Sequence, residues 1–141
     1  MSLLPGFGRR RPTARQRLAR ELASGVDGRA VALAQGGYYV ATGLWPLVSL
    51  RSFEAVTGPK TDDWLVRTVG VLAATIGGVL TIRAIAGPRN PDPLLGAASA
   101  AAFGLVDLVY AGTGRISRIY LADAAVELAL EGAWLATSRR R

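Results

Sequence analysis

Four long apolar stretches alternate with short polar segments along the chain. The longest stretch without a charge, from Ala30 to Leu50, contains 21 residues. At 1.5 Å of rise per residue, such a helix extends about 30 Å, which matches the hydrocarbon core of a bilayer. The pattern therefore predicts an all-α chain with helices over residues 30–50, 64–85, 93–112 and 118–137.

The first predicted helix combines small residues with a polar stripe. Gly36, Gly37 and Gly43 permit a neighbouring helix to approach closely, and Pro46 is expected to bend the far end of the helix. Its polar side chains fall near one face at helical spacing: Gln35, Tyr39, Thr42 and Ser49.

The second and third predicted helices contain seams of small residues, which favour close helix packing. The seams are Gly70, Ala74, Gly77 and Gly78 in the second helix and Gly96, Ala100 and Gly104 in the third. In the second helix, Arg67 and Arg83 delimit fifteen uncharged residues, so a full span requires both side chains to snorkel or to pair with acids. In the third, Asp107 lies near the same side as Phe103 and Tyr110 and is expected to point into the bundle.

The fourth predicted helix carries three acids, Asp123, Glu127 and Glu131, each four residues from the last. At 3.6 residues per turn, this spacing stacks the three carboxylates along one face, with Tyr120 and Trp134 at its ends. Acids inside a membrane are costly and mark functional sites by default. This face is therefore the first candidate for function.

The longest connection, residues 51–63, is predicted to lack a helix because Gly58 and Pro59 break one. Thr61 is expected to cap the next helix, with Asp62 and Asp63 in its first turn. A second interpretation is that the charged side chains of this loop line a pore mouth or a binding site. Those residues are Glu54, Lys60, Asp62 and Asp63.

Composition favours a membrane environment for these helices. Half of the residues are hydrophobic, and the mean hydropathy is +0.28. The competing interpretation is a soluble bundle with very apolar core helices, but such a bundle needs charged outer faces that the first three helices lack. We therefore predict an integral membrane four-helix up-down bundle over residues 30–137.

Basic segments flank this domain. Residues 1–29 form a basic arm in which Thr13 caps a short surface helix near anionic lipid headgroups, or which is simply a frayed tail, and residues 138–141 form a basic tail. The net charge is +7, but the basic residues do not form a patch interleaved with aromatics, so nucleic acid is not an expected partner. Expected partners are the bilayer, its anionic headgroups and a second copy bound through the Gly/Ala faces.

The distribution of Lys and Arg predicts an orientation in the cytoplasmic (inner) membrane. Twelve lie on the side that both termini share: Arg9, Arg10, Arg11, Arg15, Arg17, Arg20, Arg29, Arg83, Arg89, Arg139, Arg140 and Arg141. Five lie on the other side: Arg51, Lys60, Arg67, Arg115 and Arg118. The positive-inside rule therefore predicts that both termini are cytoplasmic.

This topology suggests partners for the charges within the helices. Arg67 is expected to pair with Asp107 or Asp123, and Arg83 with Glu131, which leaves Glu127 near the middle without a basic partner. Its expected neighbours are Gln35, Tyr39, Thr42 or Thr75. Desolvation and like charges one turn away favour the neutral, protonated form of Glu127.

Residues 51–70, RSFEAVTGPKTDDWLVRTVG, resemble a segment of small uncharacterised bacterial membrane proteins with four predicted helices. The likeness covers the first two helices and their loop, and it implies a membrane location without an activity. The chain differs from small multidrug-resistance transporters, whose essential Glu lies in the first helix, because no acid is present there.

Three classes of function remain open. The first is a proton-coupled carrier with Glu127 as the proton-binding group, and the second is a structural or accessory membrane subunit whose ion pairs fix helix register. The third, an intramembrane or lipid-handling enzyme, is the weakest, because the chain has no Cys, no His and no nucleotide-binding or nucleophile motif. No catalytic residue, metal or cofactor is predicted. A water-filled cavity that reaches Glu127 would favour the carrier, and a dry, paired core the structural role.

Overall fold

The computed structural model describes residue 13, residues 26–88 and residues 91–138, and this part of the chain forms five helices and no strands. The helices are α2 (Gly28–Val48), α3 (Leu50–Thr57), α4 (Asp63–Ala86), α5 (Leu94–Gly112) and α6 (Tyr120–Ser138). The all-α prediction is confirmed for these residues, and the four long helices agree with the predicted ones to within two residues. The predicted arm and basic tail lie almost entirely outside the described residues.

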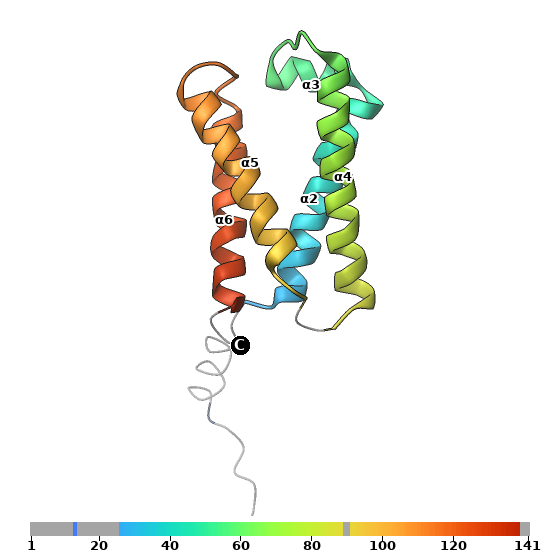
Figure 1. Cartoon of the computed structure of the whole chain (residues 1–141), viewed down its shortest axis with the longest axis vertical. Helices are drawn as coiled ribbons and strands as arrows, with labels where there is room; N and C mark the ends of the chain where they lie inside the picture. The colour runs from blue at the N-terminus through green and yellow to red at the C-terminus, as the bar shows by residue number, and fades with distance from the viewer. Residues whose placement is uncertain (1–12, 14–25, 89–90, 139–141) are drawn as a thin grey trace, which may run out of the picture.

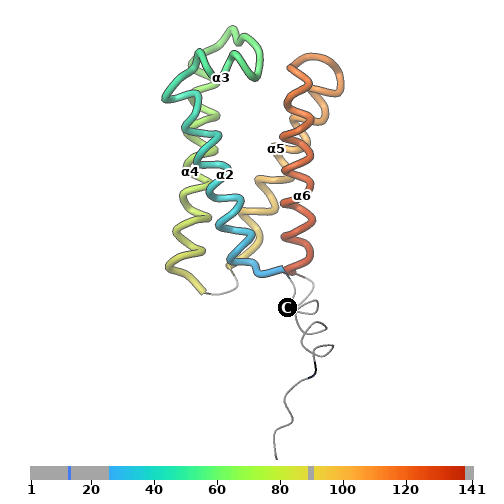
Figure 2. The backbone as a smooth tube through the Cα atoms, turned by 180° about the vertical axis from the view of Figure 1, so that it is seen from behind, coloured from blue at the N-terminus to red at the C-terminus, as the bar shows by residue number. Residues whose placement is uncertain are grey.

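The four long helices form two pairs. α2 packs along α4 and α5 packs along α6, whereas the contacts of α2 with α6 and of α4 with α5 are few. Figures 1 and 2 show that the pairs approach each other at the end where α2 begins and α6 ends, and separate toward the end that carries α3. The space between the pairs therefore widens toward α3.

Glycines bring α2 and α4 together. A methyl group built on Gly77 would lie 2.6 Å from the carbonyl oxygen of Gly36, and one built on Gly43 would lie 2.5 Å from that of Gly70. These distances leave no room for a side chain, so the two backbones touch. The predicted close approach through Gly36, Gly43, Gly70 and Gly77 is confirmed, but Gly37 and Gly78 face open space.

Small residues also form the contact between α5 and α6. Gly96 lies directly against the indole ring of Trp134, and a methyl group on Gly104 would lie 3.1 Å from the Cβ atom of Glu127. Ala100 is buried on the same face of α5, as predicted from the spacing of these residues. Gly96 and Gly104 of α5 thus leave room for the side chains of Trp134 and Glu127 of α6.

The connection after α2 contains a helix that the sequence analysis did not predict. The Ser49 side chain accepts a hydrogen bond from the Ser52 N–H at the start of α3, and Gly58 ends α3 with a φ of +86°. The prediction was wrong because Gly58 and Pro59 stop a helix without preventing one immediately before them. The edge of the Trp45 ring packs on Phe53 with centroids 5.6 Å apart, which fixes α3 against the end of α2.

The start of α4 also differs from the prediction. Thr61 does not cap this helix, because Asp62 occupies the N-cap position, and its side chain makes no capping hydrogen bond. The Thr61 hydroxyl lies 3.5 Å from the Asp62 carboxylate instead. Asp63 lies in the first turn, as predicted, where its charge is favourable to the helix dipole.

Two of the described helices, α4 and α5, are long and apolar enough to cross a membrane. α2 and α6 were also predicted to cross a membrane, but they are not apolar enough to be counted with α4 and α5. The three acids of α6 and the glycines, tyrosines and Gln35 of α2 lower their mean hydropathy. Length and composition alone are weak evidence for a membrane location, because a buried helix of a soluble protein can satisfy both.

The two adjacent glycines of α4 provide a test of the seam. We expect Gly77→Ala to destabilise the protein by about 1–3 kcal/mol, because the added methyl group meets the backbone of α2. Gly78→Ala adds the same methyl group in open space and should be neutral or stabilise by up to about 1 kcal/mol through helix propensity. Reversible unfolding of both variants in detergent measures the difference, and equal effects would contradict the seam.

Candidate functional site

The two helix pairs, α2 with α4 and α5 with α6, are joined by the side chain of Gln35 in α2, which is fully buried. Gln35 lies toward the end of the molecule where the pairs approach each other. Its amide nitrogen donates to the Gly96 carbonyl of α5 at 2.9 Å and contacts the Ser99 hydroxyl at 3.3 Å. Its amide oxygen accepts a hydrogen bond from the Trp134 indole N–H of α6 at 2.7 Å. A single side chain of α2 thus bonds to both helices of the other pair, and Trp134 closes this end.

About one turn beyond Gln35 in α2, Tyr39 contacts Glu127, the acid that is expected near the middle of the bundle. The Tyr39 hydroxyl donates to Glu127 at 2.7 Å, and both side chains are about 2% exposed. The Phe103 ring of α5 packs edge-on against Tyr39 with centroids 5.3 Å apart. Tyr39 was among the expected neighbours of Glu127, and it is the residue that donates a hydrogen bond to this acid.

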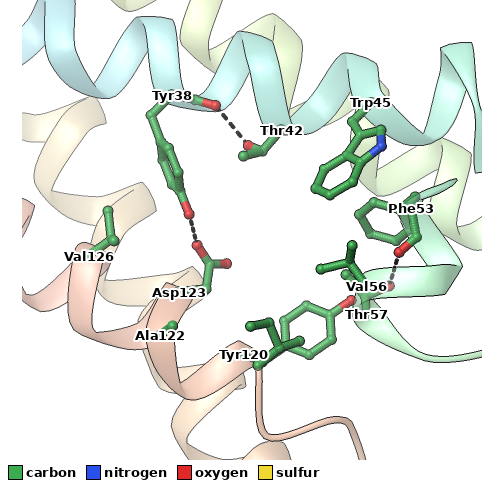
Figure 3. A pocket seen from close by; sticks show the side chains of 11 residues that line it. Tyr38, Thr42, Trp45, Phe53, Val56, Thr57, Tyr120, Ala122, Asp123 and Val126 are labelled. Atoms are coloured by element: carbon green, nitrogen blue, oxygen red, sulfur yellow. Dashed lines mark hydrogen bonds between the residues drawn. The ribbon is translucent and has the colours of Figure 1, made fainter.

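Three more acids belong to α5 and α6. The Tyr38 hydroxyl donates to the carboxylate of Asp123, which is half-buried (Figure 3). The carboxyl group of Asp107 is a neighbour of Asp123 and is buried, as the sequence predicts, and its Oδ2 atom has no hydrogen-bond partner. Glu131 is half-buried, and its Oε2 atom also has no partner.

The acids are not paired with arginines as predicted. Arg67 and Arg83 are exposed on α4, and no ion pair joins either of them to Asp107, Asp123 or Glu131, all of which belong to the described part of the chain. The physical reason is the helix arrangement, because α4 packs on α2 and lies on the opposite side of the molecule from α6 (Figure 1).

A pocket of about 230 Å³ lies between the pairs beside Asp123, toward the α3 end. Four aromatic side chains contribute to its wall, namely Tyr38, Trp45, Phe53 and Tyr120, and Asp123 is the one charged residue among those that line it (Figure 3). The rest of the lining is mostly apolar, with two threonines. The pocket thus combines an acidic group with aromatic faces from α2, α3 and α6.

Lys60, in the loop between α3 and α4, contacts two residues of the pocket wall. The Lys60 ammonium group lies 5.1 Å from the centroid of the Tyr120 ring and donates to the Thr57 carbonyl at 2.9 Å. The Glu54 carboxylate accepts a hydrogen bond from the Lys60 backbone N–H. Partial burial lowers the pKa of Lys60, and the charge of Glu54 opposes this shift in part.

None of the charged loop residues predicted as a binding loop lines the pocket. Glu54 and Lys60 organise the loop itself, whereas Asp62 and Asp63 are exposed at the start of α4. The loop helps to form the site through α3 instead, because Phe53, Val56 and Thr57 lie in the wall.

Tyr38 is a site residue that was not among the predicted ones. Tyr38 lies three residues after Gln35 and four before Thr42, so the same helical spacing that marked the polar stripe could have included it. The contributions of Trp45 and Phe53 carried no such signal, because they depend on the position of α3.

Comparison of the chain with known protein families, curated proteins and solved structures finds no match. Any function must therefore be argued from the site. No group of three or more Asp and Glu residues in the described chain is arranged to hold a metal ion. The ionisable groups of this site are carboxylates and phenols, which bind and transfer protons or hold a cation.

The contact between Tyr39 and Glu127 gives a prediction for stability. We expect Tyr39→Phe to destabilise the protein by about 1–3 kcal/mol, because the buried Glu127 loses its hydrogen-bond donor while the ring packing remains. Tyr110→Phe removes a hydroxyl from an exposed tyrosine of α5 and should change stability by less than about 0.5 kcal/mol. Detergent unfolding titrations of both variants measure the difference, and a similar loss in both would show that this hydrogen bond is unimportant.

Proposed function

We propose that the protein is a small multi-pass membrane carrier that binds protons on the carboxylates between its helix pairs. The observation that supports it most directly is the set of interior acids: tyrosines hold Glu127 and Asp123, and the Oδ2 atom of Asp107 has no hydrogen-bond partner. Asp123 lines the pocket, and Glu127, one helical turn away, does not. Acids placed only for stability would be expected to be paired with the basic residues of the chain.

Support for a membrane location comes from the surface. Large apolar side chains of α4 and α5 are more than half exposed, among them Leu72, Ile82 and Leu105. An apolar helix in the core of a soluble protein would bury such side chains, and water makes a continuous exposed row of them unfavourable. Contact with lipid tails would be favourable for this apolar surface.

The polar content of α2 and α6 does not argue against four spans, because it faces the interior. Gln35 and Tyr39 of α2 are buried against Trp134 and Glu127 of α6. The outward side chains of these two helices are apolar, including Leu33 and Leu44 of α2 and Leu121, Leu128 and Leu135 of α6. We therefore propose an up-down arrangement of four transmembrane helices, with both termini in the cytoplasm as the charge distribution predicts.

In this orientation, the pocket opens toward the outside and Gln35 and Trp134 close the cytoplasmic side. Asp123, at the pocket, is one helical turn from Glu127, which is one turn from Glu131. Four residues of an α-helix rise about 6 Å, so a short chain of water or tyrosine hydroxyls suffices to pass a proton between neighbouring acids. Alternate opening at the two ends would make the protein a carrier.

The alternative is a non-enzymatic structural bundle. The buried bonds of Gln35 favour it, because they fix helix register without requiring any substrate. The unpartnered oxygens of Asp107 and Glu131 favour the carrier, since a purely structural core gains nothing from them.

The topology is tested with reporter fusions in a bacterial inner membrane. A reporter that is active in the cytoplasm should be active after Arg141, and one that is active in the periplasm should be active after Ser117, in the connection between α5 and α6. The reason is the excess of Lys and Arg on the side of the termini. Strong periplasmic activity at Arg141 would reverse the orientation, and cytoplasmic activity at both sites would exclude four spans.

Proton transport is tested in liposomes that contain a pH-sensitive dye. We expect the wild-type chain to pass protons along a gradient, and Glu127→Gln to reduce the flux to that of empty vesicles. The amide oxygen of Gln can still accept the hydrogen bond of Tyr39, so folding should be retained.

Glu54→Gln is the matched control, because it makes the same change in the external loop and should leave the flux unchanged. If wild-type vesicles are as tight as empty ones under both pH and voltage gradients, the carrier proposal is wrong. In a structural bundle, Glu127→Gln would be neutral or mildly stabilising.

A further inference from the structure

The pocket between the helix pairs has a chemistry that points to one class of ligand. Asp123 supplies negative charge, and no basic side chain is among the described residues that line the pocket. The buried carboxyl group of Asp107 is next to Asp123, so a second acid lies close to the pocket wall. An anion would meet Asp123, and no basic side chain of the lining would compensate for this charge.

The aromatic rings reinforce this preference. Rings of Tyr38, Trp45, Phe53 and Tyr120 form much of the wall, and aromatic faces attract cations, most strongly when the cation is shielded from water. The protein already uses one of these rings in this way, because the Lys60 ammonium group lies 5.1 Å from the Tyr120 centroid. Lys60 itself does not line the pocket, whereas all four rings do.

We infer that this pocket binds a small hydrophobic organic cation, a protonated or quaternary amine with an apolar body. Asp123 would hold the charge, while the rings and the apolar lining would hold the body. The volume of about 230 Å³ lies below the ~300 Å³ of ordinary ligand pockets, which favours a molecule with a single ring or a short chain. This inference rests on the proposed carrier function, for which the pocket would be the substrate site.

The placement of the pocket also connects substrate to proton. Asp123 lies one helical turn from Glu127, so a cation at Asp123 and a proton on the neighbouring carboxyl groups are alternatives for the same negative region. Binding of the cation would favour release of a proton, and binding of a proton would favour release of the cation. This competition would exchange one for the other across the membrane.

Three probes that share a benzene ring test the inference by calorimetry on the full chain in nanodiscs. They are benzyltrimethylammonium, benzyl alcohol and benzenesulfonate, which carry positive, zero and negative charge. We expect the cation to bind about tenfold more tightly than the alcohol, and the sulfonate to bind more weakly than both. Equal affinities for the three would overturn the inference.

Two pairs of variants locate the site. Asp123→Asn should reduce the affinity for the cation to that for the alcohol, whereas Asp92→Asn, at an exposed acid before α5, should change nothing. Ala122→Leu places a larger side chain in the pocket wall and should weaken all three probes, whereas Ala125→Leu, which is also exposed on α6 but outside the wall, should not. The alanine pair retains every charge, so it still tests the site if Asp123→Asn does not fold.

The results separate this inference from the carrier proposal. Proton flux that depends on Glu127, without a preference for the cation, would leave the carrier in place and exclude this substrate class. Cation binding that depends on Asp123, without proton flux, would establish the ligand and exclude proton coupling.

Discussion

The position of one helix pair relative to the other depends on the buried amide of Gln35. Both ends of this amide are hydrogen-bonded, the nitrogen to α5 and the oxygen to Trp134 of α6, and the side chain has no access to solvent. A shift of either pair along its axis would leave a buried donor or acceptor without a partner, which costs about 1–3 kcal/mol for each group. The bonds of Tyr39 and Tyr38 to the acids of α6 extend the same register toward the pocket.

The contacts within each pair differ in kind from those between the pairs. Within the pair of α2 and α4, backbones touch through glycines, and within the pair of α5 and α6, Gly96 and Gly104 accept large side chains. Between the pairs, an apolar cluster that includes Val31, Leu80 and Trp134 packs at the closer end, and hydrogen bonds of α2 side chains to α5 and α6 extend from there toward the pocket. A rotation about that end would widen or narrow the pocket and keep the packing inside each pair, but it would break the bonds of Tyr38 and Tyr39 to α6. This is the movement that the proposed carrier requires.

The sequence predicted the helices and their glycine seams because both depend on local spacing. Gly36 and Gly77 could be recognised as contact positions from helical spacing. Tyr39 was one of four expected neighbours of Glu127, which followed from the depth of each residue in the predicted topology. The predicted ion pairs of Arg67 and Arg83 were wrong because they rested on opposite charges at a similar depth in the membrane. A similar depth does not show which helix faces are in contact. The pocket could not be predicted from the sequence, because it depends on the separation of the two helix pairs and on α3. The residues of α3 were predicted to form a loop.

The three tryptophans of the chain occupy three different environments, and this gives the molecule an intrinsic set of optical reporters. Trp134 is 1% exposed and hydrogen-bonded at the closed end, Trp45 lies in the pocket wall, and Trp64 is 68% exposed at the start of α4. Emission from a buried indole differs in wavelength from that of a hydrated one, and collisional quenchers reach only the accessible rings. Single-tryptophan variants would therefore follow the two ends and the outer surface separately, without an added label.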